Sequence, residues 1–100
     1  MLRQDVLYLV AEDPAAHGVF GVSQKVRRKV FCTVRSVGYQ EYYRAMENNL
    51  FPTLVFTLTD YAEYKGEKIC EYGGKVYRIV RTYQTGGAIE LTVEEVTVDA

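Results

Sequence analysis

The chain has 100 residues, of which 48% are hydrophobic and 25% are charged, and its formal net charge is −1. This composition is typical of one globular domain spanning residues 1–100 and excludes an intrinsically disordered chain. Because no apolar run approaches the roughly 20 residues of a membrane span, we expect no membrane partner. An N-terminal apolar run too short for a signal peptide favours a protein that stays in the cytoplasm where it is made.

Two β-strands are expected in the N-terminal third. Residues 5–11 form an apolar, β-prone run, which predicts the first strand. The segment Glu12-Asp13-Pro14 signals a turn, and residues 15–23, with two glycines, are expected to form a loop. Apolar and polar side chains alternate within residues 25–36, which predicts the second strand.

The hydrophobic period changes after Gly38 and predicts a short amphipathic helix within residues 38–49. Apolar side chains recur there at helical spacing, at Tyr39, Tyr42, Tyr43, Met46 and Leu50. Asn48 and Asn49 suit a left-handed exit from the helix. The helix has two interpretations: it caps the strands, or it is a mobile insertion that reaches a partner or a channel.

Four further strands are expected after the helix. Residues 52–59 alternate as a third strand, and residues 60–68 form a polar connector. The strands 68–72 and 75–82 flank Gly73-Gly74, a two-residue hairpin signal because both glycines can adopt positive φ. A last strand covers residues 88–98, where the alternation slips at Glu94-Glu95 and predicts a β-bulge.

This order of elements predicts a mainly β fold. Tight glycine turns between consecutive strands favour antiparallel pairing. We therefore expect a small antiparallel β-barrel or sandwich of about six strands, with one short α-helix inserted between strands two and three.

The sequence gives no sign of a catalytic, cofactor or metal site. The glycine-rich phosphate-binding motifs and the spacings of zinc ligands are not present. Cys32 and Cys70 are expected to be reduced and buried. A hydrolase built on one of these cysteines and His17 is the weakest of the alternatives, because only the residue types support it.

Basic and acidic residues separate along the chain. The second strand carries Lys25, Arg27, Arg28 and Lys29, and the C-terminus carries Glu94, Glu95 and Asp99. Three interpretations are open. The groups are two solvated strand faces, or the basic strand of one copy meets the acidic strand of the next in a ring. Alternatively, the basic strand and nearby aromatic side chains bind nucleic acid, although the net charge argues against strong nonspecific binding.

The succession of motifs resembles a known family. A basic strand at residues 26–34 precedes a helix that starts Gly38-Tyr39-Gln40-Glu41-Tyr42-Tyr43, and a further strand covers residues 52–60. The most specific part is Ile69-Cys70-Glu71-Tyr72-Gly73-Gly74-Lys75-Val76-Tyr77-Arg78-Ile79, followed by Ile89-Glu90-Leu91. The pattern is similar to the head-closure proteins (head–tail joining or stopper proteins) of tailed phages and prophages of Gram-positive bacteria.

The resemblance implies a structural protein and no enzyme or cofactor. Subunits of that family form a ring beneath the portal and adaptor rings, which retains the packaged DNA and offers a docking surface to the tail. The expected partners are other copies of the chain, an adaptor or portal-side connector protein, tail proteins and packaged DNA. The expected location is the host bacterial cytoplasm during assembly and then the head–tail interface of the virion.

Carried onto this chain, the resemblance places the insertion of residues 39–51 near the axial channel. Its channel-facing or partner-facing residues would be Tyr39, Tyr42, Tyr43, Met46, Asn48 and Asn49. The assignment of the charged residues to a subunit interface follows from charge alone. Two alternatives are another phage connector, such as a tail-completion or tail-terminator protein, and a small nucleic-acid-binding β-barrel.

Overall fold

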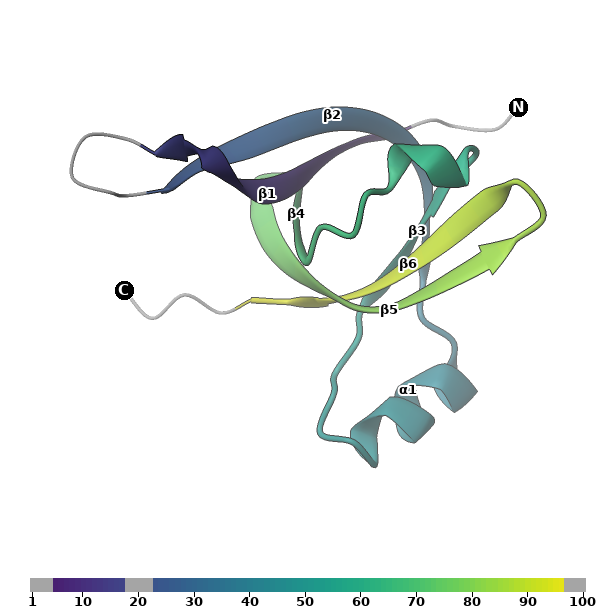
Figure 1. Cartoon of the computed structure of the whole chain (residues 1–100). Helices are drawn as coiled ribbons and strands as arrows, with labels where there is room; N and C mark the ends of the chain where they lie inside the picture. The colour runs from purple at the N-terminus through teal and green to yellow at the C-terminus, as the bar shows by residue number, and fades with distance from the viewer. Residues whose placement is uncertain (1–4, 18–22, 97–100) are drawn as a thin grey trace.

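Six antiparallel strands wrap into a closed barrel with one helix standing outside it, as Figure 1 shows. The computed structural model describes residues 5–17 and 23–96. The strands pair in the order β1-β2-β3-β6-β5-β4, and β4 pairs with β1 to close the barrel. In chain order the elements are β1 (Asp5–His17), β2 (Ser23–Ser36), α1 (Tyr39–Met46), β3 (Leu54–Leu58), η1 (Tyr61–Glu63), β4 (Ile69–Tyr72), β5 (Lys75–Thr85) and β6 (Ala88–Glu95).

The predicted fold class is confirmed, in its barrel form. Alternation along each strand sends every second side chain inward, where the small barrel is filled by side chains. Leu7 of β1 lies opposite Val30 of β2, and Phe56 of β3 lies opposite Leu91 of β6. All four are buried in one hydrophobic cluster, which the whole ring of strands encloses.

Residues with positive φ lie at the β4–β5 hairpin and at the end of α1. Gly73 and Gly74 have φ values of 59° and 80° between β4 and β5, so the predicted two-residue hairpin is confirmed. Asn49 follows the helix with φ 59°, which confirms the predicted left-handed exit. The helix and the hairpin are therefore placed by local sequence signals.

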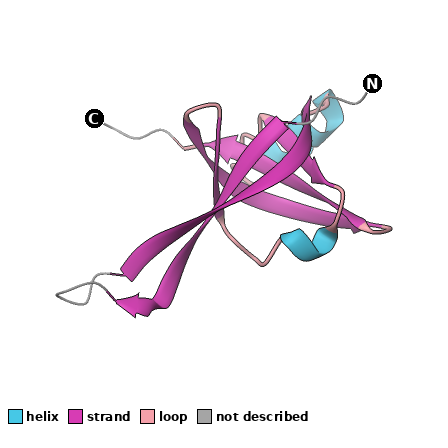
Figure 2. Cartoon of the chain, turned by 90° about the horizontal axis from the view of Figure 1, so that it is seen from above, coloured by secondary structure: helices cyan, strands magenta, loops and turns pink. Residues whose placement is uncertain are grey.

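The predicted turn at Glu12-Asp13-Pro14 is wrong, because β1 continues through it to His17. Pairing with β2 persists at Glu12 and Asp13, and the register becomes irregular between Asp13 and His17. Such an irregularity accommodates proline, which has no N–H to donate to a ladder. Residues 15–17 thus belong to β1 and Ser23 belongs to β2, which begins two residues earlier than predicted, while residues 18–22 lie outside the described residues. The paired ends of β1 and β2 project from the barrel in Figure 2.

The β-bulge lies in β5 and not at Glu94-Glu95, where the alternation predicted it. Arg78 pairs with Glu94 and Tyr77 with Glu95 in regular register. The register shifts between Ile79 and Arg81 of β5 instead. The third strand begins at Leu54, two residues later than predicted, and the last strand ends at Glu95.

Candidate functional site

Three side chains of the apolar stripe of α1 face away from the barrel, whereas Tyr42 is half-buried and Leu50 lies on the barrel side. Tyr39, Tyr43 and Met46 are 83%, 61% and 41% exposed, and no residue of the helix is buried. The rings of Tyr39 and Tyr43 stack at a centroid distance of 6.5 Å, and Tyr42 meets Tyr43 edge-on at 6.0 Å. The helix is amphipathic as predicted, and it lies beside the wall of β5 and β6 with Tyr39, Tyr43 and Met46 exposed.

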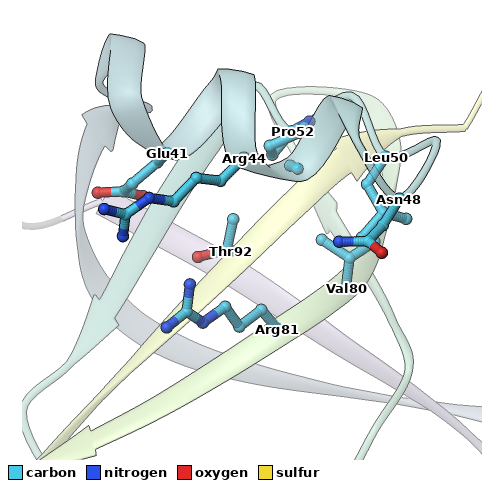
Figure 3. Close-up of a pocket in the computed structure, with 9 residues that line it drawn as sticks. Glu41, Arg44, Asn48, Leu50, Pro52, Val80, Arg81 and Thr92 are labelled. Carbon is cyan, nitrogen blue, oxygen red and sulfur yellow. The ribbon is translucent and has the colours of Figure 1, made fainter.

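The polar side of α1 faces the barrel instead. Glu41, Arg44, Ala45 and Asn48 recur at helical spacing, on the side of the helix opposite Tyr39. These four residues line a pocket of about 210 Å³ against the wall formed by β5 and β6, as Figure 3 shows. Asn48 lines this pocket and Asn49 does not, although both asparagines are exposed.

Backbone and side-chain hydrogen bonds attach the insertion to β6. The carboxylate of Glu94 accepts the backbone N–H of Phe51 at 2.9 Å and also binds the guanidinium of Arg78. The N–H of Thr53 donates to the carbonyl of Val93 at 2.9 Å. Glu94 is 8% exposed, so its carboxylate is buried against its partners within the chain. Through Phe51 it anchors the C-terminal end of the insertion to the barrel.

Both predicted interface arginines are also paired within the chain. Arg27 binds Glu71 at 3.0 Å and lies over the ring of Tyr8, 4.7 Å from its centroid. Arg28 binds Glu67 at 2.6 Å. Burial of Glu67 raises its pKa, but hydrogen bonds from its own backbone, from Arg28 and from Lys65 outweigh burial and lower the pKa overall.

The remaining predicted interface residues are dispersed. The ammonium of Lys29 lies 5.5 Å from the ring centroid of Phe31 on the outer face of β2. Glu95 approaches Lys75 at 3.8 Å. Lys25 pairs through its backbone with Glu12, and Asp99 lies outside the described residues. The predicted contact between the basic strand of one copy and the acidic strand of the next stays a prediction.

The cysteines and His17 lie apart. Asp5 pairs with Cys32 at one end of the β1–β2 ladder and His17 pairs with Ser23 at the other, about 30 Å along the strand. Burial, with a smaller effect of Asp5, raises the pKa of Cys32 to about 11. Burial, with smaller effects of Cys32 and Glu71, raises the pKa of Cys70 to about 12. Both thiols are therefore protonated at neutral pH, and the geometry gives no support to a Cys–His nucleophile.

Within residues 5–17 and 23–96, no group of three or more His, Cys, Asp or Glu gathers as metal ligands would. None of the helices described there is long and apolar enough to cross a membrane.

Sequence reasoning missed the pocket behind α1. The sequence pattern indicated the aromatic stripe but assigned no role to Arg44 and Arg81, which line this pocket. The available signal is the break in alternation at Ile79-Val80, where two apolar residues adjoin before Arg81. The role of Glu94 had no local signal, because its acceptor bond to Phe51 spans 43 positions of the chain.

Comparison with known proteins assigns no family to the chain. No family model matches it, and no curated protein matches it.

Proposed function

We propose that the chain is a structural subunit of a ring in a phage or prophage head–tail connector. There it would close the DNA-filled capsid and offer an attachment surface to the tail, without catalysis. The observation that carries this proposal is the outward aromatic face of α1. The order of the sequence motifs resembles that of head-closure proteins, and this resemblance is the reason for proposing a connector ring as the assembly.

The outward face of α1 has the chemistry of a protein interface. Aromatic and methionine side chains are enriched in interfaces, because they bury a large apolar area and tyrosine keeps a hydroxyl for hydrogen bonding. Tyr39, Tyr43 and Met46 lie on one side of the helix, and Phe51 beyond it is 52% exposed. Binding to a partner would remove this apolar surface from water.

The distribution of exposed apolar residues favours a head-to-tail assembly. Phe31 on the outer face of β2 is 53% exposed, and β2 crosses the top of the barrel in Figure 1 while α1 lies below it. Two different patches that meet between copies make a heterologous contact, which closes into a ring when the rotation allows. A tail-completion or tail-terminator protein would form a ring by the same kind of contact. Identifying the protein to which the ring binds would distinguish these roles.

The proposal is tested by the mass of the purified protein in solution. Light scattering is measured on the protein alone and mixed with the adaptor protein encoded beside it. We expect a ring-sized species in at least one sample, lost in a Tyr39→Ser/Tyr43→Ser variant. Tyr61→Ser is the matched control, since Tyr61 is 48% exposed on η1 and not on α1. A monomer in both samples would contradict the proposal.

A small nucleic-acid-binding barrel is the second candidate. The observation that favours it is the outer face of β2 and β1, where Lys29 lies over Phe31 and Arg27 over Tyr8. Glu71 neutralises Arg27 there, which weakens the case. This function predicts binding of a labelled single-stranded oligonucleotide that falls steeply with salt and is lost in Lys29→Gln/Phe31→Ser. Without binding at low salt, this candidate fails.

A further inference from the structure

A continuous groove separates α1 from the outer wall of β5 and β6. It consists of two adjoining pockets of about 210 and about 220 Å³, which share Glu41, Arg44, Arg81 and Thr92. One end is largely apolar, and the other is bordered by Tyr83 and Glu90. The apolar end is lined by Ala45, Leu50, Pro52 and Val80.

The two arginines of this groove differ from the other arginines of the described chain. Among the described residues, neither Arg44 nor Arg81 has a carboxylate within ion-pairing distance. Every other described arginine is paired: Arg27 with Glu71, Arg28 with Glu67, Arg35 with Glu41 and Glu90, and Arg78 with Glu94. The carboxylates of the groove, Glu41 and Glu90, bind Arg35 and form no ion pair with Arg44 or Arg81.

Both arginine side chains run toward the same end of the groove. Figure 3 shows the guanidinium groups of Arg44 and Arg81 on either side of the hydroxyl of Thr92, although one arginine comes from α1 and the other from β5. Guanidinium groups present several N–H donors in a plane and suit carboxylate oxygens. A carboxylate placed between them would accept hydrogen bonds from both.

The bulge in β5 directs Arg81 into the groove. Ile79 pairs with Val93 and Arg81 with Thr92, so Val80 is the extra residue. Adjacent residues of a regular strand face opposite sides, whereas Val80 and Arg81 both line the groove. A bulge that changes the direction of a side chain is frequent beside functional sites. The bulge therefore supports a binding role for the groove independently of the charges that line it.

We infer that the groove binds an acidic peptide segment of a partner protein. A glutamate or aspartate of that segment would bond to Arg44 and Arg81, and a neighbouring aliphatic side chain would cover Leu50 and Val80. Glu41 and Glu90 line the same groove and oppose a continuous polyanion, which favours one carboxylate over a nucleic-acid backbone. The inference goes beyond the proposed ring and does not require it, since a monomer would also present the groove.

The test uses the full chain labelled with ¹⁵N and titrated with short capped peptides that place leucine at different distances from glutamate. The same peptides with glutamine in place of glutamate are the chemical control, and a short single-stranded oligonucleotide is the polyanion control. We expect chemical-shift changes at the amides of Arg44, Val80, Arg81 and Thr92, produced by at least one acidic peptide. In Arg44→Gln/Arg81→Gln, affinity should fall about tenfold or more, because charge-assisted hydrogen bonds are lost.

Arg27→Gln is the matched protein control, because Arg27 is exposed but lies on β2 and is bound to Glu71. It should bind the acidic peptide as the unmodified chain does. The inference is overturned if none of the peptides binds, if the glutamine peptides bind equally, or if Arg27→Gln weakens binding as much. Tighter binding of the oligonucleotide at the same salt concentration would also overturn it, in favour of a nucleic-acid site.

Discussion

Glu94 of β6 accepts a hydrogen bond from the backbone N–H of Phe51 at 2.9 Å, although 43 positions separate them in the chain. This bond joins the end of the α1 insertion to the barrel wall, and Arg78 of β5 binds the same carboxylate. The buried carboxylate of Glu94 thereby anchors the C-terminal end of the α1 insertion, and the outer face of α1 carries the proposed assembly surface.

The first prediction concerns this carboxylate. Glu94→Ala leaves the Phe51 N–H and the Arg78 guanidinium without their acceptor, so the free energy of unfolding should fall by about 2 kcal/mol. Glu94→Gln keeps an acceptor oxygen and should cost about half as much. Urea unfolding followed by circular dichroism measures both. Glu95→Ala is the control, since this half-exposed side chain should contribute under about 0.5 kcal/mol. Equal losses for Glu94 and Glu95 would contradict this role.

The strands and turns that local signals encode could be predicted from the sequence. Gly73-Gly74 indicated its hairpin, because two successive positive φ angles are needed there. The turn signal at Pro14 was overridden by tertiary pairing, since the ladder between β1 and β2 continues past it. Helical periodicity identified the stripe of Tyr39 and Tyr43, but periodicity cannot say which side of a helix meets the barrel.

The candidate site was less predictable than the fold. The groove depends on Arg44 and Arg81, whose proximity results from barrel closure and from a bulge that no local motif specifies. The charge separation between the β2 and β6 strands was visible in the sequence. The ion pairs that neutralise Arg27 and Arg28 could not be predicted from the sequence. Their partners, Glu71 and Glu67, lie about 40 positions away in the chain.

The second prediction is an acid dependence that arises from Glu67. Its pKa lies below the ordinary value of 4.5, so its charged form stabilises the folded state. The unfolded chain binds the proton first as pH falls, and this stabilisation should be lost below about pH 4.5. We expect Glu67→Gln to flatten the fall in stability between about pH 6 and about pH 3. Unchanged acid dependence in this variant, measured by urea unfolding at each pH, would refute the assignment.

The third prediction concerns thiol reactivity. Because burial raises the pKa values of Cys32 and Cys70 to about 11 and about 12, the native protein should react very slowly with a disulfide reagent near neutral pH. Both thiols should react at once in denaturant. Absorbance of the released thiolate follows the reaction, with His17→Ala as the comparison. Rapid labelling of native protein that slows in His17→Ala would revive the Cys–His hydrolase, whereas equal, slow rates would dismiss it.

The fourth prediction separates the outer face of α1 from the core. Tyr39→Ser/Tyr43→Ser removes rings that are mostly exposed, so the unfolding free energy of the monomer should change by under about 1 kcal/mol. Phe56→Ala removes a fully buried ring of the barrel cluster and should cost about 3–5 kcal/mol. Thermal and urea unfolding at a protein concentration where the chain is monomeric would measure both. A large loss in the tyrosine variant would mean that α1 packs against its own barrel through this face, and the outward orientation on which the assembly proposal depends would then be wrong.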